Sequence, residues 1–138
     1  MFKNILVAVD GSDSACQAVW VAANLARALG ADLHIITAFD PVPAYIREFA
    51  YQIAIKAQRE EAGKILQEAL RVAGELPGRL ESEVQEGSPA DAILRTAKTH
   101  GIDLIVMGAR GLGTLSGIRL GSQSMKVLHH ADCPVLVI

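Results

Sequence analysis

Short apolar runs alternate with helical patterns along the chain. The runs at residues 5–9, 33–39 and 104–107 are mostly apolar, which is typical of strands that are buried on both faces of a sheet. Residues 80–86 instead alternate polar and apolar side chains, which predicts a half-exposed edge strand. Residues 135–138 form a last apolar run, and we expect a strand there as well.

Helical spacing fills the segments between these runs. Residues 14–29 form one predicted helix, with Ser12 or Asp13 as its cap and Gly30 at its end. Another begins at Ser88-Pro89, where a capping residue precedes a proline in the first turn, and it ends near residues 100–101. A short helix is expected at residues 123–130.

Residues 45–73 form the longest helical pattern. At about 1.5 Å per residue this segment would be roughly 43 Å long, which exceeds a typical strand layer. We therefore expect its first part to be bent, irregular or mobile, with Gly63 as a weak point. The expected core contacts of the segment are Phe49, Ile53, Ile65, Leu66, Ala69 and Leu70.

The order of these elements is strand-helix four times, followed by a strand. Such alternation predicts an α/β fold in which helices cover both faces of a parallel sheet. Five strands suit a three-layer, flavodoxin-like arrangement with strand order 3-2-1-4-5, formed by a single domain over residues 1–138. In such sheets ligands bind where the strand order reverses, which places Asp10 and Gly108 at the expected site.

Composition narrows the function classes. The net charge of −2 gives no overall positive field, so we expect neither nucleic acid nor a membrane surface as a partner. Cys16 and Cys133 do not suggest a disulfide framework. Since no apolar run is long enough for a signal peptide or a membrane span, we expect a cytoplasmic protein.

The loop after the fourth predicted strand is rich in glycine. Its skeleton, from Gly108 through Gly111 to Gly121 and Ser122, reads Gly-x2-Gly-x9-Gly-Ser. Glycines let backbone amides approach phosphate oxygens, and Ser122 just before the last helix adds a hydroxyl beside free amides. Arg110 and Arg119 can add charged hydrogen bonds. The alternative is a flexible surface loop, since the spacing matches neither a P-loop nor a Rossmann turn.

The chain resembles the ATP-binding branch of the universal stress protein family. The glycine skeleton is similar to the nucleotide-binding motif of that branch, and the resemblance extends over residues 5–12, 30–33, 87–93, 103–108 and 133–137. It implies an adenine nucleotide α-hydrolase-like fold that binds ATP (or ADP or AMP), with Mg²⁺ as a possible bridge between the phosphates. It further implies a homodimer.

The resemblance also assigns roles to residues. The ends of the first two strands would hold the nucleoside, and the end of the fourth would lie beside the ribose. The loop and the start of the last helix would form the phosphate arm. In chain order, the implied nucleotide-binding residues are Ala8, Val9, Asp10, Ala38, Met107, Gly108, Arg110, Gly111, Gly121, Ser122, Gln123 and Ser124.

Asp10 and the histidines leave alternatives open. Asp10 is either a turn or cap residue, or a ligand of the ribose or of a phosphate-bound cation. The sequence predicts no dedicated metal site, because the adjacent His129 and His130 face different directions on a helix. His34 and His100 are expected to be isolated and structural or exposed.

Three functions remain possible for such a protein. The first is a nucleotide-dependent dimeric switch in a stress response, acting on an unidentified protein partner. The second is slow ATP hydrolysis or self-phosphorylation, although the loop has no evident base; we expect no catalytic residue. The third is a dimerisation module with a vestigial pocket. The apolar last strand, Val135, Leu136, Val137 and Ile138, would pair with its own copy.

Overall fold

The sheet has the predicted topology. The computed structural model describes residues 1–109 and 121–138, and its strands lie in the order β3-β2-β1-β4-β5. Every neighbouring pair is parallel, which confirms the expected α/β fold. The strands are β1 (Asn4–Ala8), β2 (Asp32–Phe39), β3 (Leu80–Glu86), β4 (Leu104–Met107) and β5 (Val135–Val137).

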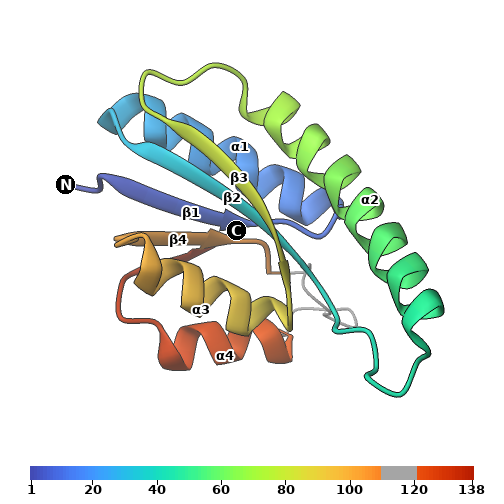
Figure 1. The fold of residues 1–138 in the computed structure, drawn as a ribbon. Coiled ribbons are helices and arrows are strands. Elements are labelled where there is room, and N and C mark those ends of the chain that lie inside the picture. The colour runs from blue at the N-terminus through green and yellow to red at the C-terminus, as the bar shows by residue number, and fades with distance from the viewer. Residues whose placement is uncertain (110–120) are drawn as a thin grey trace.

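Helices cover both faces of the sheet (Figure 1). The helices α1 (Asp13–Leu29) and α2 (Glu48–Ala73) lie on one face, and α3 (Pro89–Thr99) and α4 (Ser122–His130) lie on the other. Alternate residues of β1 divide between the two cores: Ile5 and Val7 face α1 and α2, whereas Leu6 and Ala8 face α3 and α4. The three-layer architecture follows from this alternation.

Helix boundaries follow the capping signals. The Ser12 hydroxyl accepts a hydrogen bond from the Ala15 amide at 3.2 Å, and Gly30 closes α1 with a left-handed φ of 66°. The Ser88 hydroxyl accepts from the Asp91 amide at 3.3 Å, one turn into α3. The predicted starts of both helices are therefore confirmed, with Ser12 rather than Asp13 as the cap of α1.

The long helix α2 differs from the prediction. It runs without interruption from Glu48 to Ala73, so Gly63 does not break it. The prediction that Phe49 and Ile53 contact the core is wrong, because their side chains are 79% and 56% exposed. A helix of 26 residues is about 39 Å long, whereas the eight residues of β2 span about 26 Å. The first turns of α2 therefore extend beyond the carboxyl ends of the strands (Figure 1).

The second half of α2 behaves as expected. Leu66 and Ala69 are buried against α1 and the sheet, and Ile65 and Leu70 are partly buried beside them. These positions share one helix face. The helix therefore tolerates Gly63, because packing against α1 and the sheet stabilises this half more than the helix propensity of its residues does.

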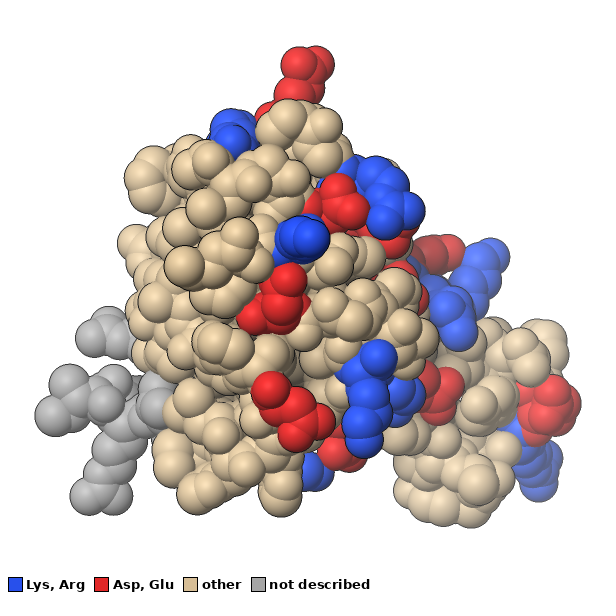
Figure 2. Space-filling view, turned by 90° about the vertical axis from the view of Figure 1, so that its left-hand side faces the viewer, with Lys and Arg blue, Asp and Glu red and all other residues tan. Residues whose placement is uncertain are grey.

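Charges of both signs are mixed on the surface. Figure 2 shows the side of the molecule where the strands begin, and acidic and basic side chains alternate there without a field of one sign. None of the helices within residues 1–109 and 121–138 combines the length and the apolar character that a membrane crossing requires.

Candidate functional site

A hollow lies beyond the carboxyl ends of the strands, where the topology predicts a ligand. The chain leaves β1 toward one face of the sheet and β4 toward the other, so the strand order reverses between them. The hollow has a volume of about 420 Å³, which is within the usual range for small-molecule sites. Three of the predicted residues line it together: Asp10, Ala38 and Gln123.

Asp10 follows β1 and shapes the turn into α1. Its Oδ1 accepts a hydrogen bond from the Ser12 amide at 2.9 Å, so its role in the turn is confirmed. Asp10 also lines the 420 Å³ hollow and a neighbouring one of about 340 Å³, which Val9 reaches as well. The turn role and the ligand role are therefore compatible for this carboxylate.

The backbone of Val9 is held within the sheet. Its amide donates to the Ile36 carbonyl at 2.8 Å, and its carbonyl accepts from the buried Thr37 hydroxyl at 2.7 Å. These bonds join the ends of β1 and β2 next to Ala38. Val9 can therefore shape the wall of a site, but its backbone groups are already occupied.

Gln123 connects the start of α4 to the start of α3. Its Oε1 accepts a hydrogen bond from the Ala90 amide at 2.9 Å, one of the amides that a helix start leaves without a helical partner. Lys126 donates to Asp91 Oδ1 at 2.7 Å one turn further on, and this bond lowers the pKa of the Asp91 carboxyl. The two links fix where the first turn of α4 lies.

The start of α4 differs by one residue from the prediction. Ser122 is the first residue of the helix and is exposed, while Gly121 is the residue that precedes it. Ser124 is buried, and its hydroxyl has no hydrogen-bond partner among the described residues. A hydroxyl buried in this way is costly unless something supplies an acceptor or a donor.

Gly108 is required by packing. A Cβ on Gly108 would lie only 2.3 Å from the Ser14 Oγ and 2.9 Å from the Ser14 carbonyl oxygen in the first turn of α1. The side chains of Ala8 and Met107 are buried in the core beside α3 and α4. At these three predicted positions only the backbone could therefore meet a ligand.

The sequence analysis missed the wall that α2 provides. Gln58, Glu61, Ala62 and Ile65 line the hollow, one turn apart along the helix. Helical spacing toward the N-terminus from the predicted core residue Leu66 could have identified this face of α2, because Ala62 and Gln58 lie four and eight residues before it. Together with Asp10 and Asp40, Glu61 makes the lining acidic, and no lysine or arginine lines it within residues 1–109 and 121–138.

Two predicted site residues, Arg110 and Gly111, lie outside the described residues, as does Arg119.

The predicted dimer residues divide into two pairs. Val135 and Val137 pack against the core beside α3 and α4, whereas Leu136 and Ile138 are 37% and 36% exposed. Leu136 lies on β5 at the edge of the sheet, and Ile138 directly follows this strand.

The histidines correct the sequence analysis. His34 and His100 are not isolated, because their ring centroids lie 5.1 Å apart. His34 Nδ1 also lies 3.3 Å from the carboxylate of Glu81. The three residues belong to the opposite end of the sheet from the hollow.

Comparisons with known proteins agree on the fold. A universal stress protein from Thermus aquaticus is 46% identical over 138 residues, covering 100% of this chain and 99% of that protein. The structure of the universal stress protein UspA from Lactobacillus plantarum superimposes with a TM-score of 0.86 at 30% identity, covering 99% and 97% of the two chains.

Two solved relatives contain adenine nucleotides. A universal stress protein in complex with cAMP has a TM-score of 0.76 and 31% identity, covering 99% and 97% of the chains. One from Archaeoglobus fulgidus in complex with dAMP has a TM-score of 0.73 and 25% identity, covering 99% and 98%. The family model described as "Universal stress protein family" matches residues 1–138. The chain therefore belongs to the universal stress protein family.

Proposed function

We propose that residues 1–138 act as one domain that binds ATP, with Mg²⁺, in the hollow at the carboxyl ends of the strands. The observation that carries this proposal is the position of the hollow: about 420 Å³ at the reversal of strand order, lined by Asp10, Ala38 and Gln123. Relatives that bind cAMP and dAMP support the adenine nucleotide class.

The charges of the site suggest how the nucleotide lies. Asp10, Asp40 and Glu61 would repel phosphates, but a carboxylate accepts hydrogen bonds from ribose hydroxyls. The nucleoside therefore occupies the acidic part, with adenine near the backbone of Ala38 and the ribose beside Met107 and Gly108. Carboxylate oxygens are also the ligands that Mg²⁺ prefers, so the same groups suit a cation that accompanies the phosphates.

The phosphates lie at the start of α4 in this arrangement. The first amides of a helix and its dipole favour an anion, and Gly121 and Ser122 occupy this end. The Ser124 hydroxyl, which has no hydrogen-bond partner among the residues that the structure describes, would gain an acceptor from a phosphate oxygen. Gln123, held by the Ala90 amide, would keep this end of α4 in place, and Arg110 and Gly111 would complete the phosphate arm.

The proposed action is a nucleotide-dependent switch of a homodimer formed through β5, in a cytoplasmic stress response with an unidentified protein partner. The exposed side chains of Leu136 on the edge strand β5 and of Ile138 directly after it support the dimer, since unpaired apolar edges invite pairing with another chain. Turnover of ATP is not part of the proposal.

Calorimetry of the purified protein with ATP and MgCl₂ tests nucleotide binding. We expect Gly121→Val to raise the Kd for ATP by at least about tenfold, or roughly 1.4 kcal/mol, because a branched side chain obstructs the amides at the start of α4. The control is Gly63→Ala, at a site with open space on α2, which should bind as wild type. Equal affinity of Gly121→Val and wild type would refute the proposed site.

Sedimentation of the dimer with and without ATP tests the switch. The dissociation constant of the dimer, or the capture of a partner, should change when nucleotide is added. If saturating ATP changes neither the dissociation constant of the dimer nor the capture of a partner, the proposed switch is refuted, whereas the proposal of nucleotide binding is unaffected.

A further inference from the structure

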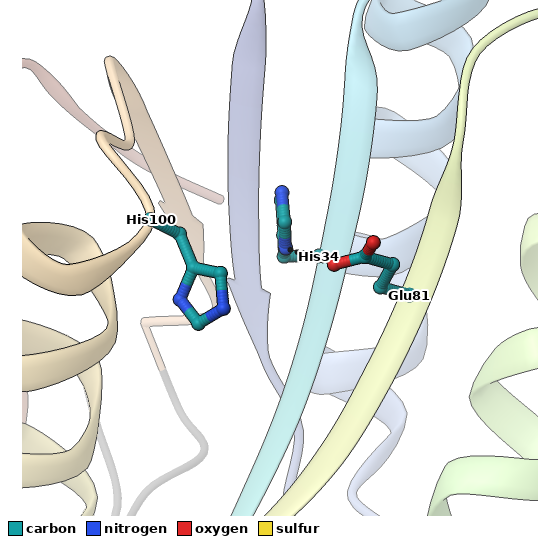
Figure 3. A group of neighbouring side chains, drawn as sticks. All are labelled: His34, Glu81 and His100. Atoms are coloured by element: carbon teal, nitrogen blue, oxygen red, sulfur yellow. Dashed lines mark ion pairs between the residues drawn. The ribbon is translucent and has the colours of Figure 1, made fainter.

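Three potential metal ligands meet at the amino end of the sheet, away from the proposed nucleotide site. They are His34 on β2, Glu81 on β3 and His100 at the end of α3, and their candidate ligand atoms all lie within 4.8 Å of one another. Figure 3 shows the side chains of the three residues converging from three separate elements. No other group of this kind occurs among the residues that the structure describes.

The fold brings these residues together without special geometry. The parallel register pairs His34 with Glu81 across β2 and β3, and cross-strand partners have neighbouring side chains. His34 shares its face of the sheet with Ile36, which packs toward α3 and α4. Since α3 covers that face and His100 directly follows its last residue, Thr99, the His100 side chain reaches the same place.

The separations are close to those of a zinc site. Two ligand atoms at 2.0–2.1 Å from a tetrahedral Zn²⁺ lie about 3.3–3.4 Å apart. His34 Nδ1 and Glu81 Oε2 are already 3.3 Å apart. The widest pair must close by up to about 1.5 Å from its 4.8 Å limit, and the exposed side chains of Glu81 and His100 have the freedom to do so.

The surroundings of the two histidines also suit a metal. Burial lowers the pKa of His34, which favours the neutral imidazole that metals bind. His100 Nδ1 lies 3.3 Å from the Thr96 carbonyl oxygen, so the tautomer that donates to this carbonyl has its lone pair on Nε2. The carboxyl end of α3 adds a negative helix dipole.

We propose that His34, Glu81 and His100 bind one Zn²⁺ ion. Two histidines and one carboxylate form a three-ligand set of the kind that leaves a fourth position for water. The hollow beside them has a volume of about 50 Å³ and is lined by all three residues, which is room for such a water. The ion cross-links the edge strand β3 to β2 and to the end of α3.

The proposal is independent of nucleotide and is tested on metal-free, nucleotide-free protein. Zinc titration by calorimetry should give one ion per chain. Cobalt added as a probe should produce the visible absorption of a low-symmetry site, and zinc should remove it. Zinc should also raise the melting temperature, because it binds only the folded chain.

Variants separate this site from other zinc ligands. His100→Gln and Glu81→Gln alter exposed side chains, so both should fold, and both should weaken zinc binding at least tenfold. His130→Gln is the matched control, because the exposed His130 borders a different hollow together with Asp132 and Cys133. It should bind zinc as wild type does.

The alternative outcome is equally definite. If wild type binds no zinc, or if His100→Gln binds it with unchanged affinity, the zinc site does not exist, and His34 and Glu81 form only a polar contact between β2 and β3. Loss of zinc binding in His130→Gln but not in His100→Gln would place the ion in the hollow beside His130 and overturn the proposal.

Discussion

The two edges of the sheet are built on opposite principles. At one edge, β3 has seven residues and presents Glu81, Glu83 and Glu86 to solvent. At the other, β5 has three residues and exposes Leu136, and Ile138 directly after the strand is exposed as well. Charge on a long edge strand discourages pairing with another chain, whereas apolar side chains permit it. Within the residues that the structure describes, the chain thus has a charged edge at β3, called the protected edge below, and an apolar edge at β5, called the open edge below.

The largest expected effect is at the open edge. Leu136→Lys places a charge where the dimer would pair, so we expect the dissociation constant of the dimer to rise at least about 100-fold, or roughly 2.7 kcal/mol. Leu136 is preferable to Val137, which packs against the core, so that a charge at Val137 would disturb the packing as well as the dimer. Light scattering over a dilution series measures the change.

The control for this variant is at the protected edge. Glu83→Lys makes a change of similar size on β3 and should leave the mass unaltered. If the wild type is a monomer at every concentration, or if Glu83→Lys dissociates the dimer as well as Leu136→Lys does, the contrast between the edges is lost.

The second effect concerns the entry to β3. A Cβ on Gly78 would lie 2.5 Å from the Ala31 carbonyl oxygen, which is backbone and cannot rotate away. We expect Gly78→Ala to destabilise the fold by about 2 kcal/mol, a usual size for strain of this kind. Urea unfolding measures it, with Gly63→Ala, which meets no atom within 4 Å, expected to be neutral or stabilising.

The smallest effect is the ion pair that leads into β3. Asp32 accepts hydrogen bonds from the Arg79 amide at 2.8 Å and from its guanidinium at 3.1 and 3.2 Å. Because the Arg79 side chain is mostly exposed, Asp32→Asn should cost less than about 1 kcal/mol. Urea unfolding at neutral pH would detect this loss, and a cost above that of Gly78→Ala would reverse the order of the two contributions.

Much of the fold was predictable because local signals carry it. Apolar runs separated by capped helices determine the sheet topology, and Ser12 and Ser88 start their helices where the sequence places them. The exposure of Phe49 was not predictable in the same way. An apolar residue at helical spacing indicates which helix face is apolar, but not whether the sheet beneath it is long enough to cover that face.

The two ends of the sheet differ in how far sequence reasoning reached. Asp10 lines one hollow, as its place after the first strand predicts, and Ala38 and Gln123, which the family resemblance implied, line it as well. His34 and His100 are far apart in the chain, and their proximity depends on the register of β2 with β3 and on the exact end of α3. The spacing of residues along the sequence shows neither the strand register nor the end of the helix, so nothing in the sequence indicated the cluster.

The tight fit of Gly108 against Ser14 affects how glycine motifs are interpreted across a family. A relative that had lost its nucleotide would still need glycine there, because the first turn of α1 leaves no room for a side chain. Retention of this glycine in a distant homologue therefore says nothing about ligand binding. Nucleotide binding in a homologue is better judged from positions after β4 where a side chain would meet no such obstruction.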